Sequence, residues 1–289
     1  MPDGCRLALG GFAVYQHPMA LVRELARQGR RDLTVVGSVN GNDVDLLAGA
    51  GCLRRVESSY VGLEKYGLAP NFRRRVERGE LEMVDYPELL SFDRFRASQD
   101  RLTFWPCDYL GGTDILTYNR DIREFGCPLT GRRLHAVPPA DPEITVIHAI
   151  AADERGNVVV PPRRLLPQSL DLTMARAART VIVTVEQIVS REYIRQHARW
   201  VELPSYCVSH VVEAPWGAHP CRHRGRITRV EHPSAGSVPV VGPVIGLSES
   251  PAAIRRPAPR LGEHTDEVLC EWLGLPPDRI RALRADGVV

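Results

Sequence analysis

The sequence predicts an α/β protein with an open, mostly parallel sheet flanked by helices and a small C-terminal α+β appendage. The first observation is the order of elements: short apolar strands alternate with helices from Leu7 to about Arg226. That order is typical of an open α/β sheet, where ligands bind at the carboxyl ends of the strands. The second is a change to short strands and proline-spaced segments beyond that point. We therefore expect two domains, residues 1–226 and 227–289.

The front of the chain reads as a strand, a loop, a helix and a second strand. Residues 6–9 form a short apolar strand, and Gly10 and Gly11 follow it as a loop. A helix over 19–28 carries its apolar side chains on one face, and residues 32–36 return as a strand. A glycine pair between a strand and a helix is where the backbone must approach something closely. A simple tight turn is the alternative interpretation.

The alternation continues through the rest of the first region. Periodicity and turn residues predict helices at 43–50, 70–78, 88–98 and 170–178, and strands at 53–59, 80–84, 102–105, 143–150, 180–185 and 209–214. The run 143–150 is almost entirely apolar, as in a parallel strand buried on both faces. Residues 111–142 are rich in Gly, Pro and charge, so we expect a long surface excursion there, a candidate cover for the active site.

The tail has a different texture from the first region. Patterns beyond residue 226 predict short strands with turns at 232–236 and 238–243, an extended arginine-rich segment at 251–259, and helices at 266–273 and 277–285.

Composition excludes several classes of protein. The formal net charge of +2 comes from acidic and basic residues balanced along the chain, which argues against nucleic-acid binding. No apolar run approaches the roughly 18 residues of a membrane span, and the start lacks a signal peptide's apolar stretch. We expect no membrane association and a cytoplasmic location. The 7 cysteines include no CxxC pair, so we expect free thiols and no metal site.

Several short motifs occur in order across the first region. They are Leu9-Gly-Gly-Phe12, Arg31-Asp-Leu-Thr34, Pro70-Asn-Phe-Arg-Arg74, Val146-Ile-His-Ala149, Gly156-Asn-Val158, Val185-Glu-Gln-Ile-Val189, Val211-Val-Glu-Ala-Pro215 and Gly217-Ala-His-Pro220. Each motif is weak alone, but together they resemble the α subunit of class I CoA transferases, glutaconate CoA-transferase in particular. The resemblance implies a coenzyme A thioester as substrate, with no permanently bound cofactor, and a carboxylic acid as the second substrate. It also implies a heteromer with a β subunit.

The resemblance places the catalytic nucleophile on that β subunit. In the family a glutamate in a Glu-Asn-Gly or Glu-Ser-Gly turn attacks the thioester and carries CoA as a glutamyl thioester. Neither tripeptide occurs in this chain. We therefore expect a transferase α subunit that is inactive without its β subunit. Two relatives with this architecture open a steroid-derived ring or decarboxylate a glutaconyl-type thioester, so a hydrolase or decarboxylase subunit is an alternative. A non-catalytic scaffold subunit is another.

The tail shows a second resemblance. The segment Arg260-Leu-Gly-Glu-His-Thr-Asp-Glu267 is similar to the carboxyl end of class III CoA transferases, the formyl-CoA and carnitine-CoA type. The catalytic aspartate of that family lies in an upstream region with no counterpart here. We therefore expect residues 228–289 to form a packing or assembly surface.

Four candidate binding residues lie just after the first strand. The amides of Gly10 and Gly11 are placed to hold a carboxylate or thioester oxygen, and Phe12 belongs to the same motif. His17 is a candidate contact for the substrate, with an exposed loop histidine as the alternative.

The remaining candidates lie further along the chain. We expect His148 and His219 to bind substrate or CoA; the alternatives are a core histidine bonded to backbone and a turn or interface residue, respectively. Glu88 is the candidate catalytic base, because the resemblance to the ring-opening relative puts a glutamate in the corresponding helix. Its alternative is a first-turn helix carboxylate. Glu186 ends a buried strand and reads as a structural acid.

Overall fold

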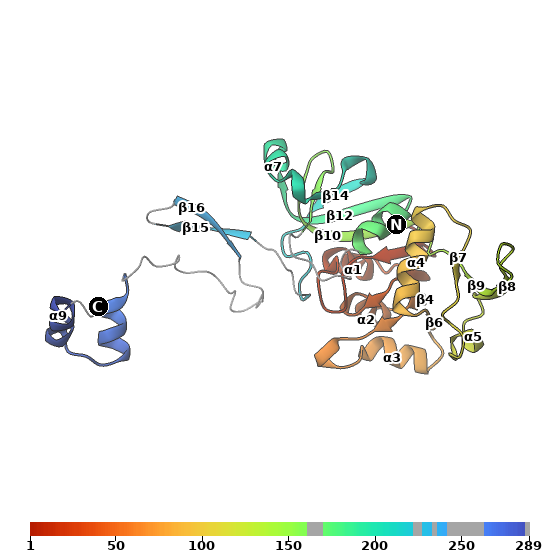
Figure 1. Cartoon of the computed structure of the whole chain (residues 1–289), viewed down its shortest axis with the longest axis horizontal. Coiled ribbons are helices and arrows are strands. Elements are labelled where there is room, and N and C mark those ends of the chain that lie inside the picture. The colour runs from red at the N-terminus through yellow and green to blue at the C-terminus, as the bar shows by residue number, and fades with distance from the viewer. Residues whose placement is uncertain (161–169, 222–226, 233–235, 242–262, 287–289) are drawn as a thin grey trace. The chain divides into compact units, whose positions relative to one another are not determined.

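The computed structural model describes residues 1–160, 170–221, 227–232, 236–241 and 263–286. The chain divides into two compact units, Met1–Arg226 and Ile227–Val289 (Figure 1). Most of the described residues belong to the first unit.

A nine-stranded sheet forms the centre of the first unit within the described residues. Its parallel strands are β1 (Arg6–Leu9), β2 (Leu33–Val36), β4 (Leu53–Ser58), β6 (Glu82–Asp85), β10 (Ile144–Asp153), β12 (Thr180–Val189) and β14 (His210–Glu213). Two short strands, β11 (Val158–Val159) and β13 (Val201–Leu203), join antiparallel beside the far end of β10. The predicted open, mostly parallel sheet is confirmed.

The strand order reverses at the centre of this sheet. From β1 the chain builds outward through β2, β4 and β6, and then returns to place β10 on the other side of β1. From β10 it builds outward again through β12 and β14. The carboxyl end of β1, beside β10, is therefore the topological switch point, the kind of place where open α/β sheets bind their ligands.

Helices cover both faces because side chains alternate along each strand. Leu7 and Leu9 of β1 share a core with α1 and α2, whereas Ala8 packs with α4 and α6. The helices are α1 (Met19–Arg27), α2 (Asn42–Gly49), α3 (Pro70–Glu77), α4 (Glu88–Gln99), α6 (Leu170–Ala177) and α7 (Arg191–Gln196). Two further strands, β3 (Val39–Asn40) and β5 (Tyr60–Val61), pair with each other.

Residues 105–137 form a small sheet of their own, which corrects the predicted surface excursion. The strands β7 (Trp105–Cys107), β9 (Arg133–Val137) and β8 (Arg123–Gly126) pair antiparallel in that order, with helix α5 (Ile115–Tyr118) between them. Their apolar side chains pack with Tyr86 and Leu90, beside β6 and α4. The excursion therefore lies at the outer edge of the main sheet and not over the switch point. The strand predicted at 102–105 is displaced to 105–107.

A buried cluster of ions joins β1 and β4 to α4. Glu57 of β4 accepts hydrogen bonds from Arg6 at 2.9 and 2.6 Å, from Arg55 at 2.9 Å and from Arg94 at 2.6 Å. The guanidinium of Arg94 also lies 3.7 Å from the centre of the Tyr86 ring. Burial alone would raise the pKa of Glu57, but Arg6 and Arg94 outweigh it and lower that pKa to about 2. The carboxylate is therefore fully ionised at neutral pH.

The second unit contains a hairpin and a helical segment among its described residues. These elements are β15 (Ile227–His232), β16 (Gly236–Val241), α8 (Thr265–Glu267), a π-helical turn (Val268–Trp272) and α9 (Pro277–Ala285). The predicted extended segment 251–259 lies outside the described residues. No helix in the described part of the chain is long and apolar enough to cross a membrane.

Candidate functional site

Gly10 and Gly11 directly follow β1, as predicted, and this end of β1 is at the switch point. The amide of Gly10 donates to the carbonyl of Val146 at 2.8 Å, and the amide of Gly11 donates to Oδ1 of Asp171 in α6 at 2.8 Å. A Cβ on Gly10 would lie 2.9 Å from Ile147 Cγ2, so the close approach requires glycine. Protein acceptors therefore engage both amides, and the oxyanion role we predicted for them has no open donor in this structure.

The loop after the glycine pair is tightly folded and strained. The backbones of half-buried Phe12 and of Tyr15 exchange two hydrogen bonds, 2.9 and 2.8 Å long. Ala13 and Gln16 adopt φ values of 52° and 57°, which cost non-glycine residues about 1–3 kcal/mol each. The Gln16 amide donates to the carbonyl of His148 at 2.7 Å. The loop is thereby fixed against β10, on the opposite side of the switch point.

His17 is fully buried, so the alternative of an exposed loop histidine is wrong. Its Nδ1 lies 2.8 Å from the carbonyl oxygen of Gly10, and its Nε2 lies 2.8 Å from that of Ala13. Both ring nitrogens therefore face backbone carbonyl oxygens. The buried carboxylate of Asp43 also lies 3.3 Å from Nδ1. This imidazole shapes the loop, and its predicted contact with substrate stays a prediction.

His148 is buried on β10 and bonds to side chains rather than to backbone. Its Nδ1 lies 2.8 Å from Oγ1 of Thr184, whose hydroxyl donates to the carbonyl of Ile147 at 3.2 Å. Nδ1 thus contacts the Thr184 hydroxyl, and Nε2 lies 3.1 Å from Oε1 of Glu186. His148 is fully buried, whereas the Glu186 side chain is 12% exposed. This pair places a polar group beside the switch point, with its carboxylate in reach of solvent.

The chain after β14 turns back toward β12 and α1; we call residues 214–221 the return segment. The amide of Ala214 donates to the carbonyl of Val185 at 2.7 Å, and that of Trp216 donates to Oε2 of Glu186 at 2.9 Å. The carbonyl of Gly217 then accepts from Ala20, at the start of α1, at 2.7 Å. The return segment is thus hydrogen-bonded to both β12 and α1. The predicted site residue His219 lies on it with its side chain exposed.

The end of the return segment buries a cysteine that is not a nucleophile. Cys221 accepts a hydrogen bond from Asn42 at 3.4 Å, and burial raises the pKa of its thiol to about 12. His17 and Asp43 are near neighbours, but both nitrogens of that imidazole already contact carbonyl oxygens. These residues therefore do not form a Cys-His-Asp catalytic triad.

Carboxylates around the switch point are committed to internal hydrogen bonds. Asp43 accepts from the side chain of Asn40 and the amide of Gly41, each at 2.8 Å. Asp171 accepts from Gly11, as described above, and Glu186 is engaged on both oxygens. Each of these acids fixes the position of a backbone amide near the switch point.

Glu88 lies apart from this group. It is exposed in the first turn of α4, which follows β6, three strands away from β1. The structure gives it the surroundings of a first-turn helix carboxylate, and its role as a base stays a prediction.

Sequence reasoning missed two members of the site and undervalued a third. Asp171 pairs with Gly11 across 160 residues, a contact that no local pattern signals. Trp216 lies between two of the short motifs, Val211-Val-Glu-Ala-Pro215 and Gly217-Ala-His-Pro220, and was not singled out. Glu186 carried a signal, because an acid at the end of an apolar strand is unusual.

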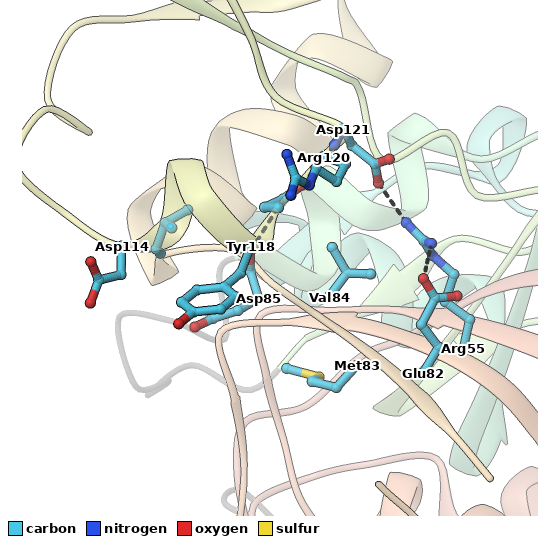
Figure 2. A pocket seen from close by; sticks show the side chains of 11 residues that line it. Arg55, Glu82, Met83, Val84, Asp85, Asp114, Tyr118, Arg120 and Asp121 are labelled. Atoms are coloured by element: carbon cyan, nitrogen blue, oxygen red, sulfur yellow. Dashed lines mark hydrogen bonds and ion pairs between the residues drawn. The ribbon is translucent and has the colours of Figure 1, made fainter. Parts of the chain in front are cut away.

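A separate pocket of about 310 Å³ lies at the outer edge of the main sheet (Figure 2). Figure 2 shows Arg55 between Glu82 and Asp121, with ion pairs to both. The same guanidinium also reaches Glu57 in the buried cluster. Arg55 is thus engaged by three carboxylates, which makes this pocket the rim of a structural ion network and a poor site for phosphates. Within the described residues no cluster of His, Cys, Asp and Glu could hold a metal ion.

Two family models match the chain. The coenzyme A transferase family matches residues 1–214, and CoA-transferase family III matches residues 175–265. Both resemblances predicted from the motifs are confirmed. The second match begins within the first unit and ends before the last residues, so its extent differs from the predicted 228–289.

Curated relatives cover the first unit. The chain is 34% identical to the A-type subunit of 3-oxoadipate CoA-transferase from Pseudomonas knackmussii, over 78% of this chain and 79% of that protein. It is 30% identical to the IpdA subunit of a cholesterol ring-cleaving hydrolase from Rhodococcus jostii, over 75% of each. An uncharacterised protein from Archaeoglobus fulgidus is 35% identical over 76% of this chain, which spans about half, 48%, of that protein.

Solved structures share the fold at similar identity. Glutaconate coenzyme A-transferase from Acidaminococcus fermentans superposes with a TM-score of 0.73 at 30% identity, covering 78% of this chain and 77% of that one. A variant of the decarboxylase AibA/AibB superposes with a TM-score of 0.68 at 33% identity, covering 76% and 81%.

Proposed function

The chain belongs to the coenzyme A transferase family and corresponds to its A-type subunit; from this premise we propose that it shapes the acyl-CoA pocket of a class I transferase. A β subunit would complete the enzyme and supply the glutamate that carries CoA. The substrates would be a CoA thioester and a carboxylic acid, and dicarboxylates are the first to test because relatives are named for glutaconate and 3-oxoadipate.

The proposed transfer divides one exchange into separate steps, and each step forms one bond to a carbonyl carbon and breaks another. The β-subunit carboxylate attacks the thioester carbonyl and the C–S bond breaks. CoA leaves as a thiolate, and an acyl-glutamyl anhydride remains on the β subunit. The thiolate then attacks the glutamyl carbonyl and releases the first acid, and the second acid reverses these steps. This chain's own residues bind and orient the thioester.

The observation that carries the proposal is the engagement of the acids at the switch point. Asp43, Asp171 and Glu186 lie on the elements around the switch point, and each already accepts a hydrogen bond within the chain. A nucleophilic carboxylate must be available to attack, so these acids suit a subunit that forms the pocket while another subunit provides the attacking group.

The test is reconstitution with the neighbouring β-type gene. The purified chain, the complex, and a complex whose β-subunit turn glutamate is replaced by alanine are assayed with acetyl-CoA and several dicarboxylates. We expect transfer by the intact complex alone. Turnover by the chain alone that survives stringent purification would overturn the proposal, and failure to form a complex at micromolar concentration would count against the heteromer.

Hydrolysis or decarboxylation of a CoA thioester is the second candidate. The similarity to part of a ring-cleaving hydrolase and to a decarboxylase, at 30% and 33% identity, supports it as well as the similarity to transferases supports transfer. The same assays run without an acceptor acid separate the three: product formed without acceptor favours this candidate. A complex that binds acetyl-CoA but turns nothing over favours the scaffold alternative.

A further inference from the structure

We propose that Trp216 is a contact residue for the CoA thioester, presented at the switch point by a clamped turn. The inference rests on the proposed function, because it assumes that a CoA thioester is the ligand. It adds a specificity residue that the candidate set lacked, and it gives Glu186 the role of a positioning residue.

The backbone on both sides of Trp216 is fixed. Its amide is held by Oε2 of Glu186 at 2.9 Å, and its carbonyl accepts from the amide of His219 at 2.9 Å. The next residue, Gly217, donates to the carbonyl of Ala214 at 2.7 Å. The ring is therefore attached to a backbone that is ordered before any ligand binds, so little entropy is lost on contact.

The turn also holds Trp216 in an unfavourable backbone conformation. Trp216 has φ of 60°, in the left-handed region that is rare for a bulky residue. A Cβ on Gly217 would lie 2.8 Å from Cε1 of His148 and 2.7 Å from the carbonyl oxygen of Ala214. The turn is thus pressed onto the His148–Glu186 pair, and strain of this kind is concentrated at ligand clamps and active sites.

The tryptophan side chain is open to solvent although the turn is packed. The Trp216 residue is 41% exposed, whereas Gly217 and Ala218 directly after it are buried. An exposed indole on a rigid backbone offers a flat apolar surface to the uncharged part of a thioester. At the end of the same segment, Arg23 of α1 donates to the carbonyl of His219.

The experiment uses the full chain in complex with its β subunit. Trp216→Ala should raise KM for acetyl-CoA about tenfold while kcat changes less than about twofold, and Trp216→Phe should retain most of the affinity. Titration with acetyl-CoA should quench tryptophan emission in the wild type, and this quench should disappear in Trp216→Phe. Tyr206→Ala is the matched control, since Tyr206 is an 87% exposed aromatic on the same unit, and it should leave KM unchanged.

Two results would overturn the inference. One is an unchanged KM and an unchanged quench in the Trp216 variants of an active complex. The other is loss of the β subunit from Trp216→Ala with unchanged KM in the complex that remains, which would make this ring a subunit contact. If the wild-type complex transfers nothing, the proposed transfer fails, whereas the emission titration still decides whether Trp216 meets the thioester.

Discussion

Two glutamates on this sheet, one buried and one half-buried, have different partners. Glu57 on β4 is 3% exposed and is surrounded by the guanidiniums of Arg6, Arg55 and Arg94. Glu186 on β12 is 12% exposed and is held by one imidazole and one amide. Three guanidiniums surround the first acid, whereas the second contacts one imidazole nitrogen and one backbone amide beside the switch point. The comparison indicates that the guanidinium cluster maintains the fold, whereas Glu186 is a polar group that remains in reach of solvent.

The largest effect should come from removing the charge of Glu57. Glu57→Gln leaves Arg94, itself 1% exposed, without its carboxylate partner, and breaking a buried ion pair this way costs about 3–5 kcal/mol of unfolding free energy. Urea unfolding followed by circular dichroism measures it. Glu82→Gln is the control, because that exposed partner of Arg55 should change stability by less than about 1 kcal/mol. Equal losses in the two variants would break the comparison.

Acid should remove the same stabilisation gradually. The pKa of Glu57 is lowered from 4.5 to about 2 in the folded state, so its contribution is present above the unfolded value and is lost as pH falls through the folded one. The shift corresponds to about 3 kcal/mol. Melting temperatures of the wild type and of Glu57→Gln should therefore converge between about pH 4.5 and pH 2. A constant gap across that range would contradict the assignment.

Glu186→Gln should separate activity from stability. The amide keeps an acceptor for Trp216 and a donor for His148, so we expect a loss of unfolding free energy below about 1.5 kcal/mol. Replacing the carboxylate beside His148 by a neutral amide should nevertheless lower kcat/KM of the complex about tenfold, or about 1.4 kcal/mol of barrier. Steady-state kinetics and urea unfolding on the same preparation give both numbers. A variant with full activity would make Glu186 as purely structural as Glu57.

Glu88 is an exposed acid that belongs neither to the surroundings of Glu57 nor to those of Glu186, and its substitution tests the reaction type. If the complex catalyses transfer, the β subunit holds the essential carboxylate and Glu88→Gln should change the rate less than about tenfold. If Glu88 is a general base, the same variant should lose about a hundredfold or more. The rate on a glutaconyl-type thioester, with and without an acceptor acid, is the measurement. A large loss that is independent of the acceptor would favour hydrolysis or decarboxylation.

The smallest effect should come from deleting the second unit. Both glutamates lie within Met1–Arg226, so a stop codon after residue 225 should leave the unfolding midpoint and β-subunit binding of the first unit unchanged. Size-exclusion chromatography with the β subunit tests it. Loss of soluble protein would show that the tail protects part of the first unit.

Local patterns were sufficient for the strands that are apolar throughout. The central run was predicted at 143–150 and observed at Ile144–Asp153, because burial on both faces leaves a continuous apolar signal. The strand predicted at 180–185 extends to Val189, since Glu186 and Gln187 interrupted the apolar pattern without interrupting the pairing. The sheet formed by β7, β8 and β9 was missed because Pro106 and Gly126 lie within strands too short to show alternation.

Position along a strand was predictable from the sequence, whereas the contacts were not. The glycine pair was placed directly after a strand and His148 within one, and the structure has them there, because position along a strand is local information. The partners of Gly11 and His148 are Asp171 and Glu186, which lie 160 and 38 residues away and depend on the completed sheet. The burial of His17 likewise depends on α2, which brings Asp43 to its ring.

The central pairing of the sheet has a consequence for how the protein folds. Arg6 of β1 meets Glu143, beside β10, across 137 residues, whereas β1 and β2 pair Leu7 with Val35. Closing the longer loop costs about 1.4 kcal/mol more chain entropy, at about 0.6 kcal/mol for each doubling of loop length. Pairings close in sequence are reached first, so the β1–β6 and β10–β14 halves should form before they join. The switch point lies where those halves meet. The amides that pair β1 with β10 should therefore acquire protection from hydrogen exchange last during refolding.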